Sequence, residues 1–447
     1  MGKKYDGTAQ ALLLVAALAL SGCATGGPYQ INLMPAPDVY GEDALDPFAD
    51  ADLVEEPDAG VLYATLREPA TEGEREHYYR NARGQVLRLG VADIELGAGD
   101  ITWEEARRIS LLKNRTEDYP LRVASVQEFG ILDRTITAFT DPVLVPEDLR
   151  GPARRFAEAV NKELRRSKRK DVYVYVHGYK VVFENPILVA AELWHFLGYQ
   201  GAFVAFSWPA TPSRWAYVGD TDTAAWSARG FRYFLQYLAE ETEVERIHIV
   251  GYSAGTRMVS RTLEQLALLH HEKTEDEIRG NVRIGHVMLV GSDVDRQLFG
   301  GYILDGLLRV PEHLTIYISE KDKALGFARW LHGRERLGQT WAQGTLSPAA
   351  IDFLYRADRL ALVNVTEAEG AASGNGHAYF RSSPWASSDI LVALMHDLSP
   401  AQRGLVRSED APTWTFPADY IERLRAAIAE VDPGLGPPQP QFKSSSL

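Results

Sequence analysis

One serine of the chain lies between two glycines in a setting that favours nucleophilic chemistry. Residues 251–255 read Gly-Tyr-Ser-Ala-Gly, with Ser253 at the centre. Residues 246–250 before it are rich in β-branched side chains, which indicates a strand, and residues 256–271 after it have the apolar spacing of a helix. A serine at a sharp strand-to-helix turn has its hydroxyl exposed above the edge of a sheet. We therefore expect Ser253 to attack acyl groups.

A serine nucleophile needs a base, and His377 is the best candidate among the eleven histidines. Around such a turn, the usual chain order is nucleophile, then acid, then histidine. Only His332, His377 and His396 lie after the plausible acids. His332 is at the end of a predicted helix, and His396 lies in an apolar helix, where we expect a structural role. His377 lies in a glycine-rich loop after the last predicted strand, from which its imidazole can reach over the sheet edge.

Two loops offer a carboxylate that can orient this histidine and stabilise its protonated form. Asp322 comes just after the predicted strand at residues 314–318. Asp293 and Asp295 occupy the same relative place after the predicted strand at residues 287–290. We favour Asp322 as the acid and keep Asp293 as the alternative.

The negative oxygen that forms during acyl transfer needs two hydrogen-bond donors. The backbone N–H of Ala254 is one candidate, because it follows the nucleophile at the start of a helix. The second should come from the turn after the predicted strand at residues 172–176, where Gly178 lets the backbone bend. We assign this role to the N–H of Tyr179 and expect His177 to be a structural residue of the turn.

Short strand-like runs alternate with helical patterns through the second half of the chain. The runs are almost free of polar residues, so each strand should be buried on both faces, as in a parallel sheet with helices on both sides. Two further β-rich segments, residues 61–67 and 87–96, precede this region. The alternating strand-like runs are residues 172–176, 202–206, 247–250, 287–290, 314–318 and 360–365.

The start of the chain resembles a bacterial lipoprotein signal. Lys3 and Lys4 precede an apolar run at residues 11–20, which is too short to span a bilayer. Leu, Ser and Gly then lead to Cys23, the only cysteine of the chain, as in a lipobox. Cys23 is therefore the expected lipidation site and membrane anchor. Ala24, in place of Asp, favours the outer membrane, with the protein facing the periplasm.

Composition and motifs exclude several classes of protein. The net charge of −14 argues against nucleic-acid binding, because no basic field is present to attract phosphates. A single cysteine excludes an intrachain disulfide and a multi-cysteine metal site. The sequence has no zinc-protease helix motif, phosphate-binding loop or dinucleotide fingerprint. We therefore expect no cofactor and no metal.

Taken in order, the motifs resemble a bacterial α/β-hydrolase family catalogued mainly as a domain of unknown function. The resemblance covers roughly residues 61–398. It implies the α/β-hydrolase fold and the roles of Ser253, Asp322 and His377, but no substrate. Lys180 replaces the Asn common in the family, and Gly-Tyr-Ser-Ala replaces the more usual Ala-His-Ser-Met around the nucleophile. The matching motifs are residues 176–179, 206–209, 249–255, 293–295, 319–325 and 376–380.

These observations predict a lipid-anchored serine hydrolase that cleaves a carboxylic ester in a small molecule or a lipid. A non-catalytic, membrane-tethered binding or scaffold lipoprotein is the alternative from another class. Acyl transfer to an acceptor other than water, or cleavage of an amide, would use the same residues. The expected domains are a signal peptide at residues 1–22, an acidic flexible tether at 23–58, the hydrolase domain at 59–408, and a helix with a disordered tail at 409–447.

Overall fold

The computed structural model describes most of the chain from Tyr29 to Leu435. The described residues are 29–41, 44–48, 60–74, 76–97, 99, 101–213, 216–332, 334–339 and 347–435. Cys23 and the expected signal peptide therefore lie outside the described residues. Among the residues that are described, no helix is both long enough and apolar enough to cross a bilayer.

A single 12-stranded mixed sheet runs through the described part of the protein, in the order β1-β4-β3-β2-β6-β5-β7-β8-β9-β10-β12-β11. The strands from β2 to β12 in this order pair in parallel, which confirms the mostly parallel sheet predicted from the sequence. The strands are β1 Gln30–Asn32, β2 Val61–Pro69, β3 Tyr79–Leu96, β4 Pro120–Ile131, β5 Asp171–Val176, β6 Ala202–Ser207, β7 Arg246–Tyr252, β8 Ile284–Val290, β9 His313–Ile318, β10 Leu360–Asn364, β11 Val406–Arg407 and β12 Trp414–Thr415.

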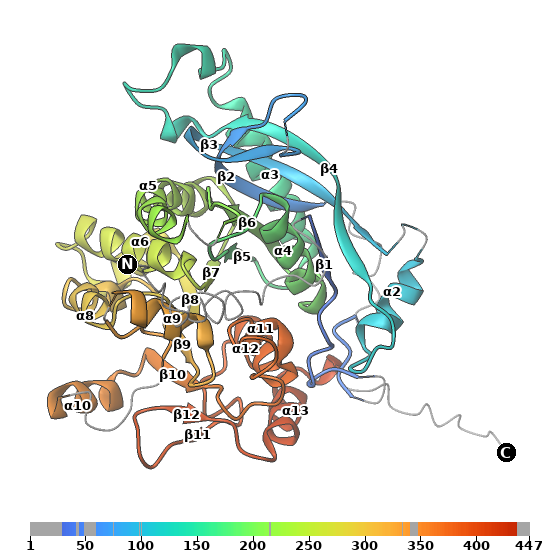
Figure 1. Ribbon diagram of the computed structural model, residues 1–447, viewed down its shortest axis with the longest axis vertical. Helices are drawn as coiled ribbons and strands as arrows, with labels where there is room; N and C mark the ends of the chain where they lie inside the picture. Colours follow the sequence, from blue (N-terminus) through green and yellow to red (C-terminus); the bar gives the residue numbers. More distant parts are fainter. Residues whose placement is uncertain are drawn as a thin grey trace, which may run out of the picture.

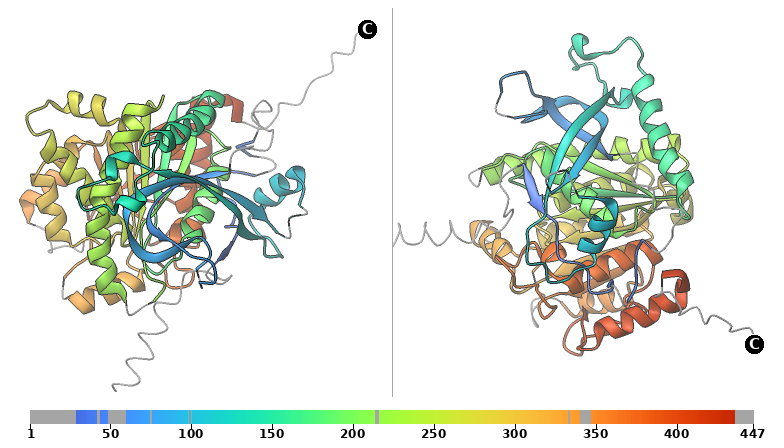
Figure 2. Two further views of the ribbon diagram at one scale, coloured as in Figure 1. Left: turned by 90° about the horizontal axis from the view of Figure 1, so that it is seen from above. Right: turned by 90° about the vertical axis from the view of Figure 1, so that its right-hand side faces the viewer.

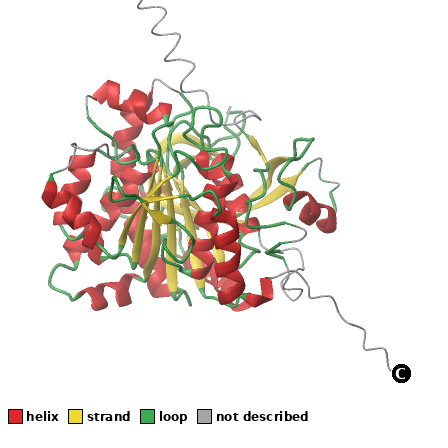
Figure 3. Cartoon of the chain, turned by 90° about the horizontal axis from the view of Figure 1, so that it is seen from below, coloured by secondary structure: helices red, strands yellow, loops and turns green. Residues whose placement is uncertain are grey.

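Helices cover both faces of this sheet (Figure 1, Figure 3). This layered arrangement is the α/β-hydrolase architecture that the alternating pattern predicts. The helices are α2 Trp103–Ser110, α3 Gly151–Arg166, α4 Glu184–Phe196, α5 Tyr217–Glu241, α6 Gly255–Leu269, α7 Glu275–Val282, α8 Arg296–Leu304, α9 Lys323–His332, α10 Pro348–Arg356, α11 Tyr379–Ser382, α12 Pro384–His396 and α13 Tyr420–Val431.

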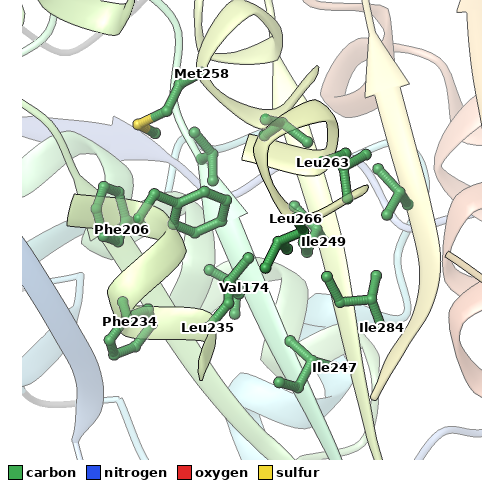
Figure 4. Packing of buried hydrophobic residues seen from close by; sticks show 14 of the residues in the cluster. Val174, Phe206, Phe234, Leu235, Ile247, Ile249, Met258, Leu263, Leu266 and Ile284 are labelled. Carbon is green, nitrogen blue, oxygen red and sulfur yellow. The ribbon is translucent and has the colours of Figure 1, made fainter. Parts of the chain in front are cut away.

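Alternate residues of the central strands enter two separate hydrophobic clusters. On β5, Val174 belongs to the cluster beneath α3, α5 and α6, whereas Tyr173 and Tyr175 belong to the cluster beneath α4 and α12. Figure 4 shows the first cluster, in which Val174 and Ile249 of neighbouring strands pack beside helix residues. Successive side chains of a strand point to opposite faces, so a strand that is apolar throughout requires a helix layer on each side.

The strands β1, β4, β3 and β2 extend the sheet in antiparallel pairing. β3 and β4 are longer than the central strands and reach beyond them, with α2 in the connection between the two (Figure 2). The β1 pairing shows that residues 29–41 and 44–48 are not a flexible tether, so that prediction is wrong for this part. The segment is ordered because it carries apolar side chains, and Ile31, Tyr40 and Phe48 are buried against the rest of the protein.

The expected boundary near residue 408 is also wrong. β11 and β12 pair with each other, and β12 pairs with β10, so the sheet continues through this region. On α13, Tyr420, Leu424 and Ile428 are buried in the cluster that also holds α12. These apolar residues, four apart on one helix face, attach α13 to the same body. The tail after Leu435 lies outside the described residues.

A buried ion pair and two tyrosine hydrogen bonds connect α12 with β9 and α13. Asp389 and Arg403 are both fully buried, and the guanidinium donates two hydrogen bonds to the carboxylate, at 2.7 and 3.1 Å. The hydroxyls of Tyr317 and Tyr420 also donate to Asp389, at 2.8 and 3.1 Å. Each carboxylate oxygen of Asp389 thus accepts two hydrogen bonds, which offsets the cost of burying its charge.

Replacing Arg403 with Leu should lower the free energy of unfolding by about 3–5 kcal/mol, because Asp389 would keep a buried charge without its partner. Urea unfolding followed by circular dichroism measures the change. The control is Arg423→Leu, which removes an exposed, solvent-screened pair with Asp419 and should lower the free energy of unfolding far less. Equal losses in the two variants would contradict the prediction.

Candidate active site

Ser253 lies at the turn between β7 and α6 with a left-handed backbone, at φ 52°. This conformation is uncommon for a residue other than glycine and places strain at the turn. Its two neighbouring glycines allow the tight packing. A Cβ on Gly255 would lie 2.2 Å from the carbonyl oxygen of His177, and one on Gly251 would lie 3.0 Å from Val259. The predicted strand–serine–helix turn is therefore present.

Ser253, His377 and Asp322 form a chain of hydrogen bonds across three loops. The serine Oγ lies 2.8 Å from Nε2 of His377, and Nδ1 of His377 lies 2.6 Å from Oδ2 of Asp322. An ionised carboxylate only accepts, so Nδ1 carries the proton and donates a hydrogen bond to Asp322. In the neutral ring, Nε2 is then the acceptor for the serine hydroxyl. The structure thus brings together three residues that are 124 and 55 positions apart.

The surroundings of His377 act on its pKa in opposite directions. Burial lowers the pKa, because a charged ring loses its hydration. The negative charge of Asp322 and its hydrogen bond raise the pKa, and the charge of Asp293 adds to this effect. The net result is a pKa above the ordinary value for histidine. The site therefore favours the protonated ring more than water does.

The loop that carries His377 is held against the two neighbouring loops. The His377 N–H donates to the side chain of Asn375 at 3.1 Å, and a Cβ on Gly376 would lie 2.3 Å from the Lys321 carbonyl. The Tyr379 hydroxyl accepts from the Gly291 N–H at 2.7 Å and donates to a β9 carbonyl at 3.0 Å. These contacts limit the positions that the imidazole can take.

Asp322 has two partners, one for each oxygen. Oδ1 accepts a hydrogen bond from the Leu325 N–H at 3.0 Å, at the start of α9, while Oδ2 contacts His377. Asp293, the alternative acid, makes a different contact. Its carboxylate lies 3.1 Å from Arg257 and 3.5 Å from Arg336. Asp322 therefore holds the position of the histidine partner, and Asp293 forms ion pairs beside it.

The two expected oxyanion donors flank the serine. A Cβ on Gly178 would lie 2.8 Å from the Ser253 Cβ, so the turn after β5 passes directly over Ser253. Tyr179 follows in this turn and is half-buried. Ala254 is buried at the start of α6, and its N–H donates no hydrogen bond to another described residue. Gly178, directly before Tyr179, and Ala254 thus lie next to Ser253, and the oxyanion roles of Tyr179 and Ala254 stay predictions.

His177 packs within the turn rather than beside the serine hydroxyl. Its ring stacks on Trp208 with centroids 5.1 Å apart and an interplanar angle of 5°. The Trp208 indole in turn donates to the His177 carbonyl at 2.7 Å. Burial lowers the pKa of His177 well below its ordinary value, so the ring stays neutral. These contacts fit the structural role that we expect for His177.

Arg67 was not apparent from the sequence, yet it holds the turn after β5. Its side chain is fully buried and donates to Val181 O at 3.0 Å and to the Ser207 hydroxyl at 2.9 Å. Burial lowers the pKa of Arg67 to about 9, against the opposing charges of Glu184 and Asp220. One arginine on a strand carries no sequence signal of this kind. Its role depends on a loop and a strand end that lie far from it in the chain.

Among the described residues, no group of three or more His, Cys, Asp or Glu side chains is arranged to hold a metal ion. The Cys23 site lies outside them.

Comparison with known proteins places the chain in a family. No curated protein matches it. Among solved structures, a nucleoside-diphosphate sugar epimerase from Corynebacterium glutamicum aligns with 10% identity over 91% of this chain and 90% of its own, with a TM-score of 0.18, which is too low for a conclusion about fold. Residues 153–393, more than half of the 447, match the family described as "Alpha/beta hydrolase of unknown function (DUF900)". The chain therefore belongs to this α/β-hydrolase family.

Proposed function

We propose that the protein is a serine hydrolase that cleaves carboxylic esters through an acyl-enzyme on Ser253. The observation that carries this proposal is the hydrogen-bond chain from the serine through His377 to Asp322, at 2.8 and 2.6 Å. The left-handed backbone at Ser253 supports it, because that conformation presents the hydroxyl at the end of β7.

In the first step, Ser253 Oγ attacks the acyl carbon of the ester while His377 Nε2 accepts the hydroxyl proton. The carbonyl oxygen becomes negative and receives hydrogen bonds from the N–H groups of Ala254 and Tyr179. Asp322 stabilises the imidazolium that forms. The tetrahedral intermediate then collapses, the bond to the leaving alcohol breaks, and His377 returns the proton to the alcohol oxygen.

In the second step, water takes the place of the alcohol. His377 accepts a proton from the water as its oxygen attacks the acyl carbon of the acyl-enzyme. The same backbone N–H groups stabilise the second negative oxygen. Collapse releases the carboxylic acid, and the proton returns from His377 to Ser253 Oγ. An acceptor alcohol in place of water would give acyl transfer by the same residues.

We also propose that lipid on Cys23 holds this activity at the outer membrane, facing the periplasm. The support is the order of residues around Cys23, since the apolar run before it is too short to cross a bilayer. An ester substrate in a lipid would then lie close to the enzyme.

Labelling by a fluorophosphonate probe should occur on Ser253, because the probe reacts with an activated serine and leaves a stable adduct. The parent chain should be labelled and Ser253→Ala should not, with in-gel fluorescence as the measurement. Ser292→Ala is the control, since that serine is buried nearby and bonded to Thr256. A folded parent that takes no label would favour the scaffold lipoprotein instead.

Asp322→Asn should lower kcat by roughly 10³–10⁴-fold on a chromogenic ester, because the imidazole loses its orienting carboxylate. Asp293→Asn should cost much less, since Asp293 makes no hydrogen bond to the imidazole and contacts two arginines. An equal or larger loss in Asp293→Asn would reverse the assignment of the acid.

The pH dependence of kcat/KM provides a second measure in the same variants. His377 acts as a base only when neutral, so activity falls as the pH drops through its pKa. Because Asp322 raises that pKa, the acid limb of the parent should lie above a pH of about 6.5. In Asp322→Asn the lowering effect of burial remains, and the limb should move to lower pH.

Cys23→Ser should release the protein from the membrane fraction, because the lipid cannot be attached without the thiol. Cell fractionation and immunoblotting measure the distribution. Fluorophosphonate labelling of the released protein should match that of the parent. A variant that stays in the membrane fraction would show that another feature anchors the chain.

A further inference from the structure

The turn after β5 is strained at the residue that follows Tyr179. Lys180 has a left-handed backbone, at φ 66°. Residues other than glycine adopt this conformation only at a cost in energy, and it persists where the surrounding structure imposes it. The same turn passes directly over Ser253, so the groups that impose the strain also fix the part of the turn beside the serine.

Asp220, in the first turn of α5, holds this strained turn from one side, and its side chain is buried. The carboxylate accepts a hydrogen bond from the N–H of Lys180. It also accepts from the N–H of Thr211, which lies 3.2 and 3.0 Å from its two oxygens. Thr211 belongs to the loop between β6 and α5. One carboxylate thus holds backbone N–H groups of two different loops.

Arg67 holds carbonyl groups of the same two loops. Its guanidinium donates to the Val181 carbonyl at 3.0 Å and to the Ala210 carbonyl at 3.4 Å. The Ala210 carbonyl and the Thr211 N–H belong to one peptide group, so the cation and the anion hold its two polar atoms. On the turn after β5, the anion holds the Lys180 N–H and the cation holds the carbonyl of the next residue.

Burying these two charges requires a reason beyond stability. Both side chains are almost fully buried, and the positive charge of Arg67 and the negative charge of Asp220 stabilise each other. Buried opposite charges often stabilise a fold no more than apolar side chains of similar volume would. Apolar side chains, however, can neither accept from an N–H nor donate to a carbonyl. The two charges are therefore suited to fixing the backbone of the turn.

We propose that Asp220 and Arg67 are positioning residues for the oxyanion donor at Tyr179. This inference rests on the proposed function, in which the Tyr179 N–H stabilises the negative oxygen of the intermediate. The peptide groups that follow this donor are held by the anion at one residue and by the cation at the next. A donor stabilises a developing charge best when it is already oriented, so a loosened turn should slow the chemical step more than substrate binding.

Asp220→Asn should lower kcat on a chromogenic ester by about tenfold or more, towards the roughly 10²–10³-fold loss that follows removal of one oxyanion donor. The KM should stay close to that of the parent. Affinity for a trifluoromethyl ketone, which forms an adduct with a negative oxygen on the serine, should fall by the same factor as kcat/KM. The acid limb of kcat/KM should not move, because the charges that raise the pKa of His377 are those of Asp322 and Asp293.

Two further variants separate positioning from folding. Arg67→Met combined with Asp220→Leu removes both charges and leaves neither of them buried alone, so this variant should fold and still lose kcat as Asp220→Asn does. Asp171→Asn is the control, because Asp171 is a buried carboxylate at the opposite end of β5, paired with Arg169, and should keep the kcat of the parent. Circular dichroism checks folding, and titration of the active sites with a fluorophosphonate gives kcat per active site.

Folded variants that keep the kcat and the ketone affinity of the parent would overturn the positioning role. An acid limb that moves in Asp220→Asn as it does in Asp322→Asn would also overturn it, because the effect would then pass through the imidazole. An equal loss of kcat in Asp171→Asn would reduce the effect to general destabilisation and overturn it as well. A parent that takes no fluorophosphonate overturns the proposed function itself, whereas a labelled parent with unchanged variants overturns the positioning role alone.

Discussion

The left-handed turn at Ser253 is the constraint on which the rest of the site depends. The turn must leave β7, expose a hydroxyl and start α6 within three residues, which brings its backbone against that of the turn after β5. Gly255 permits this approach, because any side chain there would overlap the His177 carbonyl. The Ser253 N–H also donates to the Val290 carbonyl at 2.9 Å, so β8 helps to hold the strained residue. Contacts with the turn after β5 and with the end of β8 thus hold the strained residue at the end of β7.

The close packing of these loops also brings two carboxylates, Asp322 and Asp293, near His377. Asp322 ends up with one oxygen at the start of α9 and the other on His377, so the helix and the imidazole share a single carboxylate. The Asp293 charge nearby is compensated by Arg257 and Arg336. Two carboxylates can therefore lie close to one imidazole without both acting on it equally. Asp322 accepts the hydrogen bond from His377, whereas Asp293 acts on the imidazole through its charge.

The parts of the fold that could be predicted from the sequence are those that leave a local pattern of residues. Periodicity and turn residues predicted the central strands, and chain order predicted that His377 would lie near Ser253. The pairing of β1 was missed because three residues are too few to show a period, and its partner β4 is about 90 positions away. Arg67 was missed for a related reason, since its partners, at the end of β6 and in the loop after β5, lie more than 100 positions away. Contacts of this kind depend on the folded arrangement and leave no local pattern.

The packing of residues 29–41 and 44–48 limits how far the body could lie from a membrane if Cys23 carries the proposed lipid. An unstructured segment from residue 23 to residue 58 would reach about 120 Å when fully extended. Because Tyr29 belongs to the folded body, a lipid on Cys23, as we propose, would hold Tyr29 within about 20 Å of the membrane, which is the longest span of six residues. The part of the body that carries Tyr29 would then stay close to the headgroups. If both proposals hold, ester molecules at the membrane surface would meet Ser253 more often than ester molecules in free solution.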